Sequence, residues 1–339
     1  MTTTRNGLGA ATLLEAVRRG EALAIARAIT AIENRTSIGV EMGFAAQDLW
    51  VQCRTLGITG PPGAGKSSLI NALISELLPK YRRIGVLTVD PSSPVSGGAV
   101  LGDRVRMAAH SANPNVFIRS LATRGHLGGV TRTTRAVINL LAASGMDLVI
   151  VETVGTGQSE VEVAELTDVR IVVCAPGYGD EMQAIKAGIL EVADLLVVNK
   201  SDLPDADRTA AHLKAMLRHR GHDERRLAFQ VSALNRDGLS MLAEAIDSRF
   251  AKPFEARQNV AAKKDNPRQK LAEDVADLTA AFVRDNGDPR IDDIVGELSR
   301  GAISIRDGVI AAIRVLAEQD VPPDAAGLDV AVITSRRRR

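Results

Sequence analysis

The chain has 339 residues and a mass of 36.0 kDa, enough for one large α/β domain with helical additions or for two small domains. Its 42 basic and 41 acidic residues leave a formal net charge of +1, so no overall electrostatic attraction to nucleic acid or to a membrane surface is expected. Aromatic residues make up 3% of the sequence, which argues against a stacking platform for single-stranded nucleic acid. No run of about 18 apolar residues occurs, so no membrane-spanning helix is expected.

The cysteines and the N-terminal sequence favour a cytoplasmic location. The chain contains Cys53 and Cys174, too few for a disulfide framework or a four-thiolate metal site, and reduced thiols are typical of cytosolic proteins. The stretch "MTTTRNGLGAATLLEAVRRGE" has no long apolar segment and carries Glu15 and Glu21. It therefore resembles neither a secretory signal nor an organellar presequence.

Residues 10–33 have apolar side chains at helical spacing, interrupted near Gly20, which predicts two short helices. From about residue 55 to 250, short apolar runs alternate with longer amphipathic stretches. This alternation predicts a mostly parallel sheet flanked by helices, with ligands bound at the carboxyl ends of the strands. The apolar runs are "TLGIT", "RIGVLTVD", "NVFIRSL", "MDLVIVET", "DVRIVVCAP", "DLLVVNK" and "LAFQVSAL", and the expected helices are 66–78, 130–144, 181–193 and 206–220.

The stretch "GITGPPGAGKSSL" fits the pattern G-x-x-x-x-G-K-[ST] of a phosphate-binding loop between a strand and a helix. Glycines let backbone N–H groups face the phosphates, and the helix N-terminus adds partial positive charge. Lys66 would reach the β- and γ-phosphates, and the Ser67 hydroxyl would ligate Mg²⁺. The predicted phosphate-loop residues are Gly60, Pro61, Pro62, Gly63, Ala64, Gly65, Lys66, Ser67 and Ser68.

The stretch "VVNKSD" ends another apolar run with Asn199, Lys200 and Asp202, a pattern that suits guanine. A carboxylate can accept hydrogen bonds from N1–H and the exocyclic amine of guanine, whereas adenine offers neither donor there. The Lys200 stem can cover the face of the base. The next strand end, "VSAL", carries Ser232, Ala233 and Leu234, whose backbone N–H groups can reach the guanine carbonyl.

Acidic residues at other strand ends indicate a Mg²⁺ site. "LVIVETVGTGQSE" places Glu152 at the end of a buried strand, followed by Gly155, whose N–H can contact the γ-phosphate. Most small GTPases have Asp at the position of Glu152. Asp90 in "TVDPSS" and Asp103 in "LGDRVRM" are further candidate ligands, although acids of this kind are also common at helix caps and turns.

After residue 255 the strand pattern ends and helical patterns follow. Leu271, Val275, Leu278 and Phe282 share one helix face, and Ser304 with Asp307 resembles a capping box before another helix. The region is interpreted either as a helical appendage or as a subunit interface, with the interface favoured. The expected organisation is an N-terminal helical extension over 1–50, a GTPase domain over 51–255 and a C-terminal helical segment over 256–339.

These motifs resemble the methylmalonyl-CoA mutase-associated GTPases of the MeaB/ArgK type over roughly residues 10 to 250. The matching strings are "IARAITAIEN", "GITGPPGAGKSSL", "VLTVDPSSPVSGGAVLGDRVRM", "ETVGTGQSE" and "APGYGDEMQAIKAGILEVADLLVVNKSD". The resemblance implies a P-loop fold of the SIMIBI type and a dimeric GTPase, whose hydrolysis we expect to be slow alone and stimulated by its partner. It also implies a chaperone that gates cofactor loading, protection and reactivation of an adenosylcobalamin-dependent acyl-CoA mutase. No glutamine directly follows Gly155 to orient water, and this is why hydrolysis is expected to be slow without the partner. A cobalamin adenosyltransferase is a second candidate partner.

Carried over by position, the resemblance assigns GTP or GDP to the loops described above and Mg²⁺ to Ser67 with the three acids. It implies a switch segment that responds to nucleotide and partner, in which Tyr178 stands where a small residue is usual. The switch residues are Asp180, Glu181, Gln183 and Lys186. Lys66, Asp90, Glu152 and Lys186 are the candidate catalytic residues.

Three other functions fit parts of the pattern. A metallochaperone-type GTPase for metal insertion would show a His-rich tract or a Cys-x-x-Cys pair. The segment "HLKAMLRHRGH" has His212, His219 and His222, which are too few for such a tract and are interpreted as part of a solvated helix. A P-loop kinase acting on a transport protein would transfer phosphate to protein rather than to water. A nucleic-acid-binding GTPase is disfavoured by the near-zero net charge.

Overall fold

The computed structural model describes residues 9–48, 53–90, 110, 112–122, 129–153, 166–177, 193–219, 228–251, 267–285 and 288–318. They fall into two compact units that divide at Pro267, with Arg35–Ser37 counted in the second unit. The predicted Asp103, Gly155 and switch residues lie outside the described residues. In the part of the chain described, no helix is both long and apolar enough to cross a membrane.

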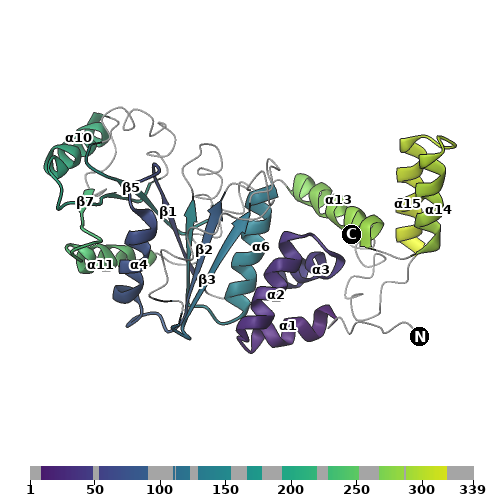
Figure 1. Ribbon diagram of the computed structural model, residues 1–339, viewed down its shortest axis with the longest axis horizontal. Helices are drawn as coiled ribbons and strands as arrows, with labels where there is room; N and C mark the ends of the chain where they lie inside the picture. The colour runs from purple at the N-terminus through teal and green to yellow at the C-terminus, as the bar shows by residue number, and fades with distance from the viewer. Residues whose placement is uncertain are drawn as a thin grey trace, which may run out of the picture. The chain divides into compact units, whose positions relative to one another are not determined.

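The first unit is built on a seven-stranded sheet with the strand order β3-β2-β4-β1-β5-β6-β7 (Figure 1). All neighbouring strands pair in parallel, as the continuous apolar runs predict. Parallel pairing puts the carboxyl ends of all the strands at one edge. The strands are β1 (Arg54–Thr59), β2 (Ile84–Asp90), β3 (Val116–Ala122), β4 (Leu148–Thr153), β5 (Val169–Cys174), β6 (Leu195–Val198) and β7 (Ala228–Gln230).

Helices cover both faces of this sheet (Figure 1). One face packs against α4 (Lys66–Leu77) and α11 (Leu239–Phe250). The other face packs against helices from the N-terminus and the middle of the chain: α1 (Ala10–Arg18), α2 (Ala22–Glu33), α3 (Ser37–Asp48), α6 (Gly129–Ala143) and α10 (Ala206–His219). The expected helix 181–193 lies outside the described residues up to residue 192, and the other helices expected between residues 55 and 220 are present within one residue at each end.

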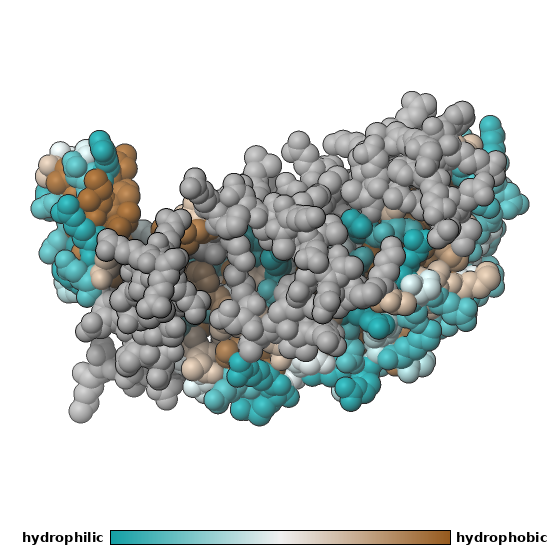
Figure 2. Space-filling view, turned by 180° about the vertical axis from the view of Figure 1, so that it is seen from behind, coloured by the Kyte–Doolittle hydropathy of each residue, from teal (hydrophilic) through white to brown (hydrophobic). Residues whose placement is uncertain are grey.

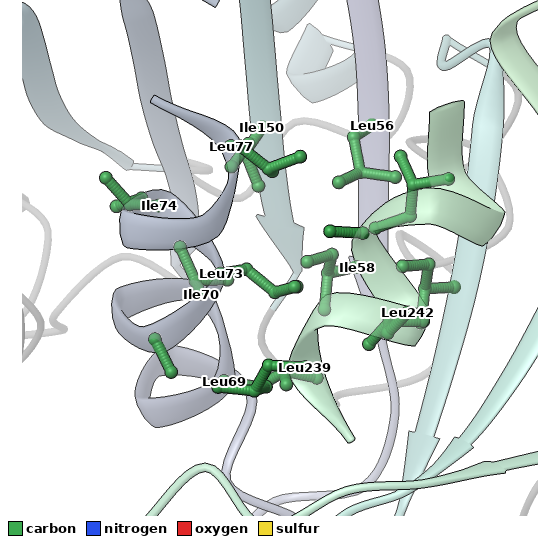
Figure 3. Packing of buried hydrophobic residues seen from close by; sticks show 14 of the residues in the cluster. Leu56, Ile58, Leu69, Ile70, Leu73, Ile74, Leu77, Ile150, Leu239 and Leu242 are labelled. Atoms are coloured by element: carbon green, nitrogen blue, oxygen red, sulfur yellow. The ribbon is translucent and has the colours of Figure 1, made fainter. Parts of the chain in front are cut away.

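The core beneath α4 and α11 is aliphatic, as the scarcity of aromatic residues requires. Leu73 of α4, Leu242 of α11 and Ile58 of β1 are fully buried and point toward one another (Figure 3). Burying a side chain of this size contributes roughly 1.5–3 kcal/mol. The phosphate-loop helix α4 therefore has a fixed position relative to both the sheet and α11.

The two N-terminal helices break at Gly20, which has a φ of +76°. The guanidinium of Arg83 donates to the carbonyl oxygens of Ser144 at 2.6 Å and Gly20 at 3.3 Å, so this turn is bonded to the main body. Farther along, Glu33 pairs with Arg119 of β3 at 2.6 Å.

The sequence pattern did not predict α3, because its apolar residues do not gather on one side of the helix.

The second unit contains α13 (Pro267–Asp285), α14 (Pro289–Ser299) and α15 (Ile305–Glu318). A small core of Phe282, Ile291, Ala312 and Val315 joins them. The Ser304 hydroxyl accepts a hydrogen bond from the Asp307 backbone N–H at 3.1 Å and donates to the Asp307 carboxylate at 2.6 Å. The expected cap at the start of α15 is therefore present. Helix α14 is an addition that the sequence pattern did not predict.

Candidate nucleotide-binding site

The phosphate loop lies between the end of β1 and the start of α4, at the carboxyl edge of the sheet. Gly60 has a φ of +144° and Gly65 a φ of +86°, conformations that L-residues with side chains rarely adopt. A Cβ on Gly60 would lie 2.1 Å from the carbonyl oxygen of Val173, and one on Gly65 would lie 2.5 Å from Nδ2 of Asn199. Both positions therefore need glycine, for backbone conformation and for space.

Lys66 and Ser67, the first two residues of α4, are both buried. The Lys66 ammonium donates to the carbonyl oxygens of Gly60 at 2.8 Å and Pro61 at 3.2 Å, so its charge lies directly over the loop. The N-cap residue Gly65 has no side chain that could cap α4, and the partial positive charge at a helix N-terminus favours a bound anion. A phosphate chain is the ligand that this combination of charge and donors suits.

Glu152 and Ser67 form the part of the site suited to a metal ion. The Ser67 hydroxyl donates to Oε1 of Glu152 at 2.8 Å, and Glu152 is 2% exposed. Glu152 lies on the α4 face of β4, because Leu148 and Ile150 of the same strand pack in the core beneath α4. A hydroxyl next to a carboxylate provides hard oxygen ligands of the kind that Mg²⁺ prefers.

The other predicted metal ligands are only partly placed. Asp90 is the last residue of β2, the strand next to β4, and Asp103 is outside the described residues. Within the ranges that the structure describes, no group of three His, Cys, Asp or Glu side chains is close enough together to hold a metal. Of the predicted ligands, the structure thus brings Ser67 and Glu152 together.

Asn199 joins the phosphate loop to the loop expected to bind guanine. Its side-chain amide donates to the carbonyl oxygens of Ala64 at 3.0 Å and Gly65 at 3.2 Å. Its side-chain oxygen accepts a hydrogen bond from the backbone N–H of Ala233 at 3.1 Å, and its own N–H donates to the carbonyl oxygen of Cys174 at 2.8 Å. One buried side chain therefore connects three loops at the carboxyl edge of the sheet.

Lys200 and Asp202 follow Asn199 in the order that the sequence predicts. Lys200 has a φ of +59°, an uncommon conformation for a residue with a side chain. Its Cε lies 3.8 Å from the Cβ position of Gly65, so the stem runs beside the phosphate loop. Asp202 is exposed, and its Oδ1 accepts a hydrogen bond from the buried hydroxyl of Ser232. The Asp202 carboxylate is thus oriented and still accessible to a ligand.

The turn after β7 holds Ser232, Ala233 and Leu234. Ser232 and Asp237 exchange two backbone hydrogen bonds of 3.1 Å, and the Asn235 N–H donates to the Ser232 hydroxyl at 3.1 Å. Leu234 is 84% exposed at the tip. Asn235 and Asp237 were absent from the predicted site, although the sequence "NRDG" is typical of a turn and could have indicated them.

The two cysteines are buried free thiols with raised pKa values. Burial raises the pKa of Cys174 to about 12. Burial, followed by the charges of Asp168 and Asp147, raises the pKa of Cys53 to about 12 as well. Both thiols therefore stay protonated at neutral pH, and neither is suited to nucleophilic chemistry or metal binding.

A parallel sheet with a phosphate loop opening α4 and a second ligand loop after β6 defines a P-loop nucleotide-binding protein. The family model described as "Methylmalonyl Co-A mutase-associated GTPase MeaB" matches residues 25–287. The chain belongs to this family, as its sequence motifs predict.

Sequence similarity to named relatives is consistent with membership of this family. A protein of Pyrococcus horikoshii named as a GTPase is 47% identical over 60% of this chain and 65% of its own length. GTPase ArgK of Escherichia coli is 43% identical over 57% of this chain and 60% of its own length. The mouse protein "Methylmalonic aciduria type A homolog, mitochondrial" is 41% identical over 62% of this chain and 52% of its own length. The alignments thus span less than two thirds of each of these relatives.

Among solved structures, the chain is similar to that of a LAO/AO transport system kinase. The match has a TM-score of 0.62 and 26% sequence identity, and it covers 93% of this chain and 100% of the other. The likeness extends over nearly the whole chain, and it supports the P-loop fold assigned from the sheet and the phosphate loop.

Proposed function

We propose that this chain binds and hydrolyses GTP, and that the bound nucleotide gates cofactor loading, protection and reactivation of an adenosylcobalamin-dependent acyl-CoA mutase. The observation that carries the nucleotide assignment is the bonding of Asn199 to Ala64, Gly65 and Ala233. This arrangement brings a phosphate-binding loop and a guanine-type carboxylate loop into a single site. Family membership supports the GTPase activity.

In the proposed reaction the protein supplies binding and electrostatics. Lys66 neutralises charge on the β- and γ-phosphates, while Asp202 and a backbone N–H of the turn 232–234 read the base. Ser67 and Glu152 would hold Mg²⁺, which neutralises phosphate charge when bound, and the 2.8 Å hydroxyl–carboxylate pair is consistent with that role. Asp90, Asp103, Gly155 and Lys186 remain proposed contributors, together with the switch residues Asp180, Glu181 and Gln183. Water attacks slowly until the partner binds and contacts the switch residues.

The proposal of a mutase as partner is supported by the description of the family and by the name of one relative. The family is described as associated with methylmalonyl-CoA mutase, and the mouse relative is named for methylmalonic aciduria. A mutase for a related acyl-CoA and a cobalamin adenosyltransferase are further candidate partners. We also propose that the protein works in the cytoplasm, for which its two buried free thiols are the support.

We propose that residues 256–339 form a dimerisation arm next to a GTPase domain over 51–255 and an N-terminal extension over 1–50. The support is a stripe of exposed apolar residues on α15 that the small core of the second unit does not use. Figure 2 shows apolar side chains gathered on one helical pair of this unit. The stripe consists of Ile305, Val309, Ile310 and Ile313.

A kinase that phosphorylates a transport protein is the second candidate, favoured by the name of the similar solved structure. The two functions differ in the acceptor of the γ-phosphate, which is water for a GTPase and a side chain for a kinase.

The experiment that tests the proposed function measures hydrolysis of GTP and ATP side by side, with and without a purified adenosylcobalamin-dependent acyl-CoA mutase. Slow GTP-specific hydrolysis that rises with the mutase supports the proposal. ATP preference with transfer to protein would contradict it.

A further inference from the structure

Glu76 lies near the end of α4 and contacts the turn that carries the proposed base-binding residues. Its Oε1 pairs with Nη2 of Arg236 at 3.2 Å, and its Oε2 accepts a hydrogen bond from the Ser240 hydroxyl at 3.1 Å. Both oxygens of one carboxylate are thus bonded to residues that follow β7. Arg236 belongs to the turn itself, and Ser240 to the first turn of α11.

The turn and the start of α11 have features that make an external carboxylate useful. Arg236 has a φ of +63°, a strained conformation that surrounding contacts must maintain. Within α11, the N-cap residue Gly238 makes no side-chain capping bond and the first turn contains no acidic residue. Negative charge near a helix N-terminus is stabilising, and here Glu76 supplies it from α4.

We propose that Glu76 is a positioning residue for base recognition, and this proposal rests on the guanine nucleotide assigned above. Through Arg236 and Ser240, Glu76 fixes the turn that holds the Ser232 hydroxyl. The Ser232 hydroxyl in turn orients Asp202. Because α4 begins with Lys66 and Ser67, this carboxylate links the phosphate-binding helix to the base-binding turn.

The same two parts of the fold are joined a second time, away from the turn. Asp247 of α11 accepts a hydrogen bond from the Tyr81 hydroxyl at 2.7 Å and pairs with Lys80, both of which follow α4. Like Glu76, Asp247 is a partly exposed acid between α4 and α11. It touches neither the turn nor the start of α11 in these bonds, so Asp247→Ala is a matched control for Glu76→Ala.

The test measures binding of GDP, IDP and inorganic pyrophosphate to the full chain by displacement of a fluorescent GDP analogue. Pyrophosphate probes the phosphate loop alone, and IDP lacks the exocyclic amine of guanine. For Glu76→Ala we expect a loss of about three- to five-fold in GDP affinity, the size given by partly exposed polar contacts, with pyrophosphate affinity unchanged. Glu76→Gln should regain part of the loss, and Asp247→Ala should bind all three ligands as the wild type does.

A purely structural role would lower the melting temperature of both variants without a selective loss of GDP binding. Unchanged GDP affinity in Glu76→Ala, an equal loss for GDP and pyrophosphate, or the same selective loss in Asp247→Ala would each overturn the proposal. Wild-type protein that binds GDP and IDP equally would instead overturn the guanine assignment, and the role of Glu76 in base recognition with it.

Discussion

The side-chain amide of Asn199 donates to the carbonyl oxygen of Ala64 at 3.0 Å, from a residue that is 2% exposed. Because the same side chain accepts from the Ala233 N–H, the phosphate loop and the turn after β7 share one buried anchor. Displacement of either loop would leave a buried amide group unsatisfied, which is costly. The two halves of the proposed nucleotide site are therefore held together before any ligand arrives.

Replacement of Asn199 with alanine should disrupt this anchor. The change removes the side-chain partners of Ala64, Gly65 and Ala233, and we expect the free energy of unfolding to fall by about 2–3 kcal/mol. Affinity for GDP should fall at least about ten-fold, since both loops lose their common support. Urea unfolding and GDP titration check the two effects. The exposed surface-turn variant Asn115→Ala should change neither quantity, and wild-type GDP affinity in Asn199→Ala would contradict the bridging role.

The sheet could be predicted from the sequence because its strands are short, continuously apolar and separated by helical patterns. Each of the seven predicted runs contains or overlaps one observed strand. Helix α3 could not be predicted in this way, because its apolar residues are spread around the helix although Met42 and Ala46 are buried. Its burial comes from tertiary contacts that local periodicity does not encode.

The nucleotide loops could be predicted because phosphate and guanine recognition need particular residue types at fixed spacing. The same reasoning missed Glu76 and Arg236, which are separated by 160 positions in the chain and meet through the packing of α4 on α11. A salt bridge between distant elements leaves no local sequence signal. Fixed motifs are therefore visible in a sequence, whereas the residues that support them depend on the fold.

Gly60→Ala should destabilise the protein strongly. The new Cβ would lie 2.1 Å from the carbonyl oxygen of Val173, at a φ of +144°. Overpacking of this kind should lower the free energy of unfolding by about 2–3 kcal/mol and reduce nucleotide affinity. Gly43→Ala is the control, since the nearest atom to its Cβ is 4.0 Å away and the residue is helical. It should leave stability equal or raise it by up to about 1 kcal/mol. Equal stability of the two variants in urea would contradict the expected clash.

The buried thiols predict an alkaline loss of stability. Cys53 and Cys174 have pKa values raised from 9.0 to about 12 in the folded protein. Well below pH 9 the thiols are protonated in both the folded and the unfolded state, so they make no pH-dependent contribution to the free energy of unfolding. As the pH rises from 9 towards 12 the unfolded thiols ionise first, and stability falls by about 1 kcal/mol per thiol at pH 10. Urea unfolding at pH 8 and pH 10 measures the effect. The variant Cys53→Ala/Cys174→Ala should show a shallower pH dependence, and an unchanged slope would exclude the thiols as its cause.

Ile313→Asp should weaken the proposed dimer. Ile313 is exposed on α15, and a charge placed there would be desolvated in an apolar interface. We expect the dimer dissociation constant to rise at least about ten-fold while the circular dichroism spectrum is unchanged. Sedimentation equilibrium measures the constant. Glu297→Lys changes an exposed polar position on α14 and should have little effect. A monomeric wild type, or a dimer indifferent to Ile313→Asp, would contradict the role of the apolar stripe.

Asp202→Asn should change the base preference from guanine to xanthine. In the proposed site the Asp202 carboxylate accepts from the N1–H and the exocyclic amine of guanine, and an amide in its place would present a donor to that amine. Xanthine has a carbonyl oxygen at that position, which the new amide can bond. We expect GDP affinity to fall about 100-fold and XDP affinity to rise, since a site built to bond one group rejects a ligand that leaves it unpaired.

Displacement of a fluorescent nucleotide from the protein by GDP and by XDP measures the two affinities, and their ratio gives the base preference. Ser232 donates to Asp202 through its hydroxyl, so Ser232→Ala should lower GDP affinity by a smaller factor without favouring XDP. Asp202→Asn tests whether the carboxylate recognises the base, and Ser232→Ala tests whether the hydroxyl orients that carboxylate. An Asp202→Asn protein that still prefers GDP would mean that the base lies elsewhere. Asn199 would then anchor a phosphate site whose base is read by other residues.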